Sequence, residues 1–478
     1  MSITAPMPAL CLGSLVFLGF VPRPLFTLSD PRRAAVEAIV DEELERGEAW
    51  RKLEELCSKA PRRLSGSEGA ARAVAWARET LIADGLENVH LEPCLVPRWE
   101  RGSVAELAVI APQALAGTKI PVLALGGSVA TPPEGLEADL LVVRSFDELA
   151  ALGERARGGF VLFDRAMDDA AYDPFDAYGG AVDQRSRGAI EGAKHGARAA
   201  LVRSMTMRRD DHPHTGMMQY EEGVARIPAA AVSTNGADLL ARLVAEEEPV
   251  RLRLRLDCRT LDPVPSSNVI GELSGRERPE EVVLVGGHLD AWDVGEGAHD
   301  DGAGCVESME ALRLLRKLDL RPRRTVRCVL FMNEENGLAG AQAYLAAHEG
   351  ELARHVFAIE SDRGGFSPRG FTSPIEGAGR EELAELVALL GRTGADRLFP
   401  GGGGADIGAL ARYGVPLAGL YTDPQRYFDF HHSELDRLEA VHPRELELGA
   451  AALASLAWLV AEREAPLPRL PPPAPKNE

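Results

Sequence analysis

The spacing of apolar residues changes along the chain and divides it into three parts. Between residues 31 and 83, apolar positions recur every three to four residues, a period typical of amphipathic helices, and a turn-rich break at 61–69 interrupts this stretch. The segment 84–102 begins with Asp84-Gly85 and then alternates apolar and polar residues, which predicts a turn followed by a strand.

From residue 114 to residue 261 the chain consists of short apolar runs, such as PVLALGG and GGFVLFD, separated by glycine, proline and charged turns. Such runs are typical of strands, and one helical stretch, Gly188–Gly196, lies among them. The pattern predicts a compact β-rich module of ordinary domain size, inserted into a host domain.

Beyond residue 262, apolar runs of strand length alternate with segments of helical period. This alternation predicts an α/β fold in which helices cover both faces of a mixed sheet. The predicted organisation has five ranges: a signal or unstructured segment (1–30), the first part of the main domain (31–113), the insert (114–261), the second part of the main domain (262–464) and a Pro-rich tail (465–478).

The first of these ranges contains one apolar run, Pro8–Val21, which has the length of a signal-peptide core and is short for a membrane span. No Lys or Arg precedes it, and no clean cleavage site of small residues follows. Two alternatives stay open: a signal, which implies a secreted or periplasmic protein, or a packed or unstructured segment of a cytoplasmic one. No later apolar run approaches membrane length, so we expect no stable membrane span in the mature body.

Composition excludes one class of partner. The apolar content of 45% and charged content of 26% are those of an ordinary globular protein. The formal net charge of -20 repels phosphates, so we expect no binding to nucleic acid. The six cysteines are scattered without a CxxC pair, which argues against a zinc site made of cysteines.

Several apolar runs of the C-terminal part end in residues of one chemical kind. In open α/β sheets the carboxyl ends of the strands meet at one edge, where functional groups collect. Charged residues of solvated loops would include Lys, yet these ends carry only imidazoles and carboxylates, which are metal ligands. A Gly-rich loop then adds Asp300 and Asp301 just before a helical pattern. The residues at the strand ends are His288, Asp290, Glu334, Glu335, Asp362, His431 and His432.

This inventory suits two divalent ions that activate one bridging water. We assign Asp300 as the carboxylate that bridges both ions. His288 and Asp362 are assigned to one ion, and Glu335 and His432 to the other. The sequence therefore predicts metal-activated hydrolysis.

The remaining polar residues of these motifs have other expected roles. Glu334 has no metal in this assignment, and a carboxylate beside the water is the general base that the reaction needs. Asp290 is placed to accept a hydrogen bond from the second ring N–H of His288. His299 is expected to be a loop residue beside the site. The HPHTG motif (212–216) has no carboxylates nearby, so a surface or lid loop is preferred to a metal role.

These motifs resemble those of the co-catalytic zinc aminopeptidase and glutamate carboxypeptidase clan, and within it the chain is most similar to the carboxypeptidase Q family. The resemblance covers most of the chain and rests on RLSGSEG, PHTG, GGHLDAWDVGEGAHDDGAG, FMNEENG, ESD, GGGADI and FHHSELD. It implies two zinc ions, the same five ligands and Glu334 as the catalytic base. It also favours His432 over His431 as ligand, because His432 begins the family pattern His-Ser/Thr-x-x-Asp.

The resemblance carries further implications. It implies that the insert is a protease-associated-type domain, that a cis peptide links Asp300 to Asp301, and that the protein is a homodimer that cleaves dipeptides or short peptides. Asp301, Asp406, Trp292 and His431 are expected to contact the substrate or to support the ligands. Ala405 and Arg437 stand where the family has Thr or Ser and Thr, respectively.

Two other functions stay open at this point. A general zinc aminopeptidase of the same clan would use the same ligands, because substrate preference resides in loops outside the metal core. A non-catalytic relative would lack ligands, whereas all five ligands and the base are present here.

Overall fold

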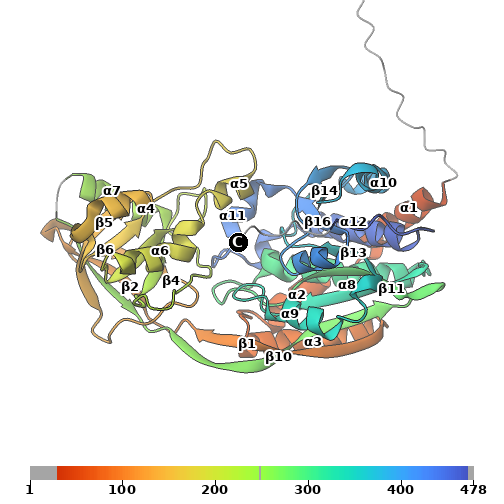
Figure 1. The fold of residues 1–478 in the computed structure, drawn as a ribbon, viewed down its shortest axis with the longest axis horizontal. Coiled ribbons are helices and arrows are strands. Elements are labelled where there is room, and N and C mark those ends of the chain that lie inside the picture. Colours follow the sequence, from red (N-terminus) through yellow and green to blue (C-terminus); the bar gives the residue numbers. More distant parts are fainter. Residues whose placement is uncertain (1–29, 247–248, 472–478) are drawn as a thin grey trace, which may run out of the picture.

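The computed structural model describes residues 30–246 and 249–471. The predicted segment 1–30 therefore lies outside the described residues except for Asp30, and the Pro-rich tail is described only to residue 471. Figure 1 shows two units side by side, connected by a long ribbon of β1 (Glu87–Glu100) and β10 (Arg259–Leu273). These two strands pair antiparallel from Glu87 opposite Glu272 to Glu100 opposite Arg259.

The larger unit contains an eight-stranded mixed sheet in the order β1-β10-β12-β11-β13-β16-β14-β15. Its centre is parallel, since β11 pairs with β12 and β13, and β13 pairs with β16, whereas β10 and β14 run antiparallel to their neighbours β12 and β16. The remaining strands of this sheet and their bounds are β11 (Arg278–His288), β12 (Arg324–Phe331), β13 (His355–Glu360), β14 (Pro368–Ser373), β15 (Leu398–Pro400) and β16 (Leu417–Thr422).

Helices cover both faces of this sheet. Val283 and Val285 of β11 belong to one hydrophobic core, and Leu284 between them belongs to a second core that includes Tyr344. Alternate residues of a strand point to opposite faces, so the two cores lie on opposite sides of the sheet. The first core packs α1 (Pro31–Arg46), α2 (Ala49–Lys59), α3 (Glu68–Ala83), α8 (Ala303–Lys317), α10 (Gly377–Val387) and α12 (Pro443–Ala461), and the second packs α9 (Ala339–Ala347). The predicted α/β fold is thus confirmed.

The smaller unit has its own eight-stranded sheet, in the order β3-β2-β9-β5-β6-β7-β8-β4. Its first strand, β2 (Ala105–Ala111), pairs with β9 (Arg251–Leu256), so the sheet of the smaller unit starts before the predicted boundary at 114. At the other boundary, β10 of the main sheet begins at Arg259, before the predicted end of the insert at 261. The other strands are β3 (Lys119–Ile120), β4 (Val122–Ala124), β5 (Leu136–Val143), β6 (Phe160–Phe163), β7 (Ala199–Arg203) and β8 (Ala229–Val232). The helices are α4 (Phe146–Leu152), α5 (Pro174–Gly179), α6 (Asp183–Lys194) and α7 (Thr234–Ala245), more than the one expected helical stretch.

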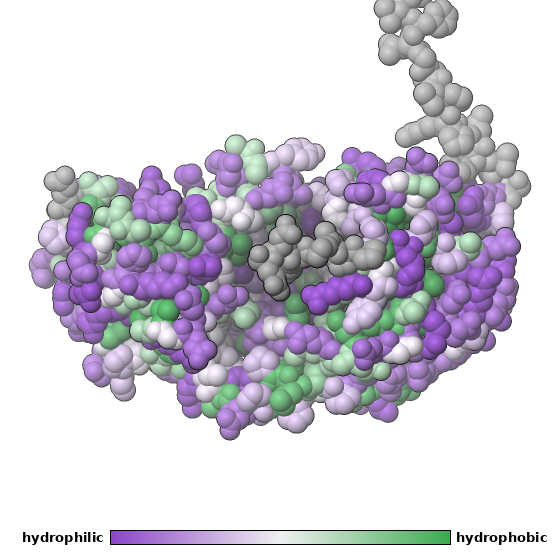
Figure 2. Space-filling view, viewed as in Figure 1, coloured by the Kyte–Doolittle hydropathy of each residue, from purple (hydrophilic) through white to green (hydrophobic). Residues whose placement is uncertain are grey.

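Hydrophilic residues dominate the face of the molecule shown in Figure 2, and hydrophobic residues form smaller patches there. Within residues 30–246 and 249–471, no helix has both the length and the apolar character needed to cross a membrane. The five cysteines in these ranges are all buried and unpaired, as expected for small apolar residues.

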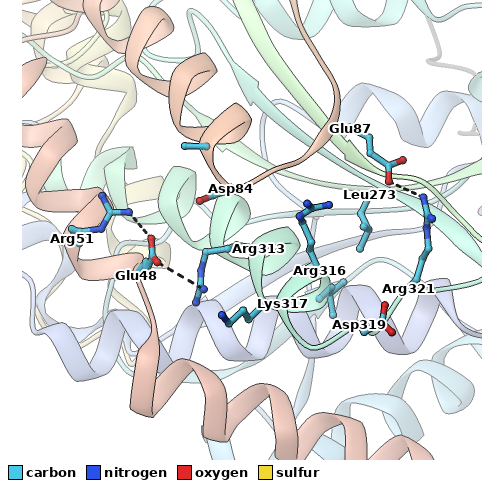
Figure 3. Close-up of a pocket in the computed structure, with 12 residues that line it drawn as sticks. Glu48, Arg51, Asp84, Glu87, Leu273, Arg313, Arg316, Lys317, Asp319 and Arg321 are labelled. Carbon is cyan, nitrogen blue, oxygen red and sulfur yellow. Dashed lines mark hydrogen bonds and ion pairs between the residues drawn. The ribbon is translucent and has the colours of Figure 1, made fainter.

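A buried ion network connects α2 to α8. Lys52 Nζ on α2 lies 2.7 Å from a carboxylate oxygen of Asp84 and 2.7 Å from one of Glu310, and the side chains of Lys52 and Glu310 are fully buried. Arg313 also pairs with Glu310. Beside the network, at the C-terminal end of α8, a surface pocket of about 570 Å³ is lined by ion pairs such as Glu48–Arg51 (Figure 3).

The substitution Lys52→Met is expected to lower the free energy of unfolding by about 3 kcal/mol, because it leaves two carboxylates buried with fewer counter-ions. The matched control is Arg51→Met on the same helix, which removes only half-exposed pairs and should cost under about 1 kcal/mol. Urea denaturation at an unchanged m-value measures both. Equal losses in the two variants would contradict a special contribution from the buried network.

Candidate metal centre

The candidate ligands converge at the carboxyl edge of the main sheet. His288 is the last residue of β11, Glu335 follows β12, and Asp362 follows β13. Asp300 lies in the turn that leads into α8, and His432 follows the short helix α11 (Tyr427–Phe430). The parallel strands bring together residues that are far apart in the sequence, as their positions at strand ends predict.

Asp300 lies between two histidines. Its Oδ1 is 3.2 Å from Nε2 of His288, and its Oδ2 is 3.2 Å from Nε2 of His432. Each histidine has one further carboxylate: Asp362 Oδ1 is 3.4 Å from His288 Nε2, and Glu335 Oε2 is 3.1 Å from His432 Nε2. The arrangement therefore consists of two His–carboxylate pairs that share a central carboxylate.

His431 lies farther from the carboxylates than His432. Its Nε2 is 3.8 Å from Asp300 Oδ2, and its ring stacks on that of His432 with centroids 3.5 Å apart. The distances favour His432 as the ligand and leave His431 as its packing neighbour.

The electrostatics of the cluster fit bound cations. Burial, together with the charge of Asp300, raises the pKa of Glu335 to about 7. Burial favours the neutral ring of His432, but Glu335 and Asp300 raise its pKa to about 10. Asp300 Oδ2 and Glu335 Oε1 are buried without a hydrogen-bond partner, and buried carboxylate oxygens of this kind are stabilised by a metal ion. A set of imidazole nitrogens and carboxylate oxygens fits zinc.

Asp290 differs from its expected role. The group that faces His288 Nδ1 is the main-chain carbonyl of Asp290, at 3.0 Å, whereas the nearer carboxylate oxygen is 3.9 Å away. That oxygen instead accepts the backbone N–H groups of Asn333, at 2.6 Å, and of Glu334, at 3.1 Å. The Asp290 side chain therefore positions the loop that carries Glu334. The sequence could not predict this, because a two-residue spacing does not specify which oxygen of Asp290 turns toward the His288 ring.

Two aspartates hold the backbone around Asp300. Asp301 accepts the backbone N–H of His288 at 2.9 Å and that of Gly304 at 3.0 Å, and the peptide between Asp300 and Asp301 is cis, as the resemblance implies. Asp436 accepts the N–H of Asp300 at 3.1 Å, a supporting contact that sequence reasoning did not assign. The His-Ser-x-x-Asp spacing was the available signal for it.

The other expected residues lie near the centre in different roles. Trp292 is buried, with its ring 5.6 Å from that of His432, so it packs against the candidate ligand. Asp406 is buried with no hydrogen-bond partner for its carboxylate, and burial together with the charges of Glu360 and Glu334 raises its pKa well above the usual range. His299 is buried against Phe366 with ring centroids 4.0 Å apart, beside the site as expected.

Arg63 was missed as a supporting residue. It is fully buried and donates to the carbonyl groups of Leu289, at 2.7 Å, of Glu296 and of Gly297, at 2.7 Å, and so fixes the Gly-rich loop that precedes Asp300. The motif RLSGSEG contains Arg63, but nothing local in the sequence indicates a contact with a loop so far along the chain.

Comparisons with known proteins agree with this geometry. The model of peptidase family M28 matches residues 268–457, a range that contains all five candidate ligands. Carboxypeptidase Q from Bos taurus and that from Homo sapiens are each 39% identical to this chain over 407 residues, which are 85% of this chain and 84% of each relative.

Solved structures show the same fold. A peptidase M28 precursor from Shewanella amazonensis SB2B superposes with a TM-score of 0.88 at 34% identity, and the match covers 92% of this chain and 99% of that one. An aminopeptidase from Aneurinibacillus sp. strain AM-1 superposes with a TM-score of 0.63 at 19% identity, over 91% of this chain and 98% of the other, which shows a shared fold alone.

Proposed function

Because the chain belongs to peptidase family M28 and is a zinc metallopeptidase similar to carboxypeptidase Q, we propose that it hydrolyses dipeptides or short peptides with two zinc ions and a glutamate base. The observation that carries this proposal is the position of Asp300 between two His–carboxylate pairs. A shared carboxylate with a separate pair on each side suits two ions better than one.

In the proposed site, His288 and Asp362 would hold one ion, Glu335 and His432 would hold the other, and Asp300 would be shared by both. When bound, the two zinc ions would lower the pKa of the water between them and polarise the scissile carbonyl.

Glu334 is the proposed base. Burial, together with the charges of Asp362, Glu335 and Asp300, raises its pKa well above the usual range of a glutamate. A carboxylate of raised pKa is a better proton acceptor, and it can return the proton to the leaving amine. The backbone N–H of Glu334 donates a hydrogen bond to the Asp290 carboxylate, and this bond holds Glu334 beside the candidate ligands.

Arg185 of helix α6 supports recognition of a free carboxylate. Its guanidinium donates to the Tyr178 hydroxyl at 2.7 Å and lies 3.4 Å from both the Thr215 carbonyl oxygen and His432 Nδ1. The residue is buried and its Nε atom has no hydrogen-bond partner, and within the described ranges no carboxylate forms an ion pair with it. A buried guanidinium without a counter-ion favours an anionic ligand, and the C-terminal carboxylate of a short peptide is one. This supports the dipeptidase function over a general aminopeptidase.

The substitution Arg185→Met is expected to raise KM for free dipeptides about 10- to 100-fold, because loss of a hydrogen bond to a charged group costs about 1.5–3 kcal/mol of binding free energy. Hydrolysis of the matching peptide amides should change little, because they lack the carboxylate. Arg187→Met on the exposed side of α6 is the control. Equal losses on acids and amides, with normal zinc content, would contradict carboxylate recognition.

The function itself is tested by assaying the purified protein on dipeptides, N-blocked dipeptides and amino-acid anilides. Cleavage of dipeptides is expected. Cleavage of anilides without cleavage of dipeptides would support the alternative, a general zinc aminopeptidase of the same family.

Two further proposals rest on the resemblance: the smaller unit is a protease-associated-type domain, and the active protein is a homodimer. A third rests on the apolar run Pro8–Val21, which has the length of a signal-peptide core: the protein is secreted or periplasmic.

A further inference from the structure

The HPHTG motif (212–216) of the smaller unit reaches the metal centre of the larger one. The sequence favours a surface or lid loop for this motif, but the structure separates its two histidines. His212 is exposed by 37% and lies 2.7 Å from Glu434, whereas His214 is only 1% exposed. The inner half of the motif therefore packs at the junction of the two units.

Three contacts join this loop to the candidate ligand His432 and its neighbour. His214 Nδ1 lies 2.6 Å from the carbonyl oxygen of His431, and the N–H of Thr215 donates to the carbonyl oxygen of His432 at 2.9 Å. The Thr215 carbonyl oxygen lies 3.3 Å from His432 Nδ1. The loop thus contacts the carbonyl groups of the peptides before and after His432, and also the ring of His432.

The contact with the Thr215 carbonyl favours the state of the ring that a metal ligand needs. A carbonyl oxygen only accepts hydrogen bonds, so the contact with Thr215 at 3.3 Å favours a ring proton on Nδ1 of neutral His432. The guanidinium of Arg185, which only donates, competes for the same nitrogen from 3.4 Å. The lone pair of Nε2 then faces Asp300 and Glu335, at 3.2 Å and 3.1 Å. A hydrogen bond to the second ring nitrogen orients metal-binding histidines in this way.

His432 also needs support from its surroundings because its backbone is strained. Its φ of 60° lies in the left-handed region, which residues other than glycine rarely occupy. Such a conformation persists only where neighbouring contacts hold it. The hydrogen bonds from Thr215 and His214 are contacts of that kind.

The supporting loop is itself fixed to the sheet of the smaller unit. The Ser204 hydroxyl oxygen accepts the N–H of His214 at 2.9 Å and donates to the Val232 carbonyl oxygen at 2.8 Å. The Thr215 hydroxyl donates to the Ala124 carbonyl oxygen at 3.0 Å. Because β8 and β4 supply these carbonyl groups, the loop is anchored in the sheet of the insert.

We propose that the His214–Thr215 segment is a positioning element for His432, so that the insert completes the metal site of Glu335 and His432 but not that of His288 and Asp362. This inference rests on the proposed two-zinc function. It gives the insert a role in metal binding that is separate from contact with the substrate.

The test is zinc titration of the full-length zinc-free protein in competition with a chromophoric chelator. In His214→Ala, one of the two zinc affinities is expected to fall about 10- to 100-fold while the other stays at its wild-type value, since loss of a group that orients a ligand has this effect. His214→Asn should restore most of the affinity, because its amide N–H can replace the Nδ1–H. His212→Ala, in the same loop, should bind both ions as the wild type does.

The controls separate this proposal from its premise. Circular dichroism of the zinc-free variants checks that they fold, and the Asn variant tests the contact even if the Ala variant is unstable. Wild-type affinity for both ions in His214→Ala, or an equal loss at both sites in a folded variant, would overturn the positioning role. A wild-type chain that binds a single zinc would instead contradict the two-ion function on which the inference rests.

Discussion

Replacing Glu334 with glutamine is expected to lower kcat by about 10²- to 10⁴-fold, the usual contribution of a general base, while zinc content and KM stay near their wild-type values. Glutamine keeps the size of the side chain but cannot accept the proton. Glu334 contacts the protein through its backbone N–H to Asp290, which the substitution does not alter. Steady-state kinetics on a dipeptide, with zinc measured on the same sample, gives the result.

The adjacent glutamate provides a matched comparison. Glu335→Gln should also reduce activity, but through loss of zinc, because Glu335 Oε2 lies 3.1 Å from His432 Nε2 in the candidate ligand cluster. If Glu334→Gln hydrolysed dipeptides at the wild-type rate while fully loaded with zinc, another group would have to be the base.

The second large effect is expected for Asp300→Asn. A carboxamide has one oxygen and no charge, so it is a poor bridge between two cations, and both ions should bind more weakly. We expect zinc content after dialysis to fall from two ions per chain toward none and hydrolysis to fall to background. Mass spectrometry of metals and the dipeptide assay measure the two effects.

Asp362→Asn is the comparison for this prediction, because the carboxylate of Asp362 lies 3.4 Å from His288 and belongs to one of the two His–carboxylate pairs. It should lower the affinity for one ion and leave the other in place. Retention of two zinc ions by Asp300→Asn would contradict the bridging role.

The sequence predicts the main fold well, since alternation of strand and helix lengths is a local signal. It also predicts which candidate ligands meet, because the carboxyl ends of parallel strands share an edge. The strand β14 (Pro368–Ser373) escaped prediction because PRGFTS contains no apolar run, and α4 and α5 were missed because they span only one or two turns.

Contacts between distant segments were beyond sequence reasoning. Arg185 and His214 lie far along the chain from His432, and no local periodicity indicates that they approach it. Asp290 shows the same limit on a smaller scale, since the spacing predicted its closeness to His288 but not that its carbonyl makes the contact.

The β1–β10 ribbon has a consequence for the order in which the chain assembles. Among the described strands, β1 pairs with β10 alone. During synthesis it therefore has no partner strand until the whole smaller unit has been made. Pairings between residues so distant along the chain form slowly, and the smaller unit can form its own sheet in the meantime. The candidate ligands come later still, from His288 onward. The complete set of candidate ligands is therefore available to zinc only after both units have been synthesised, so that metal binding can contribute to the last stage of folding.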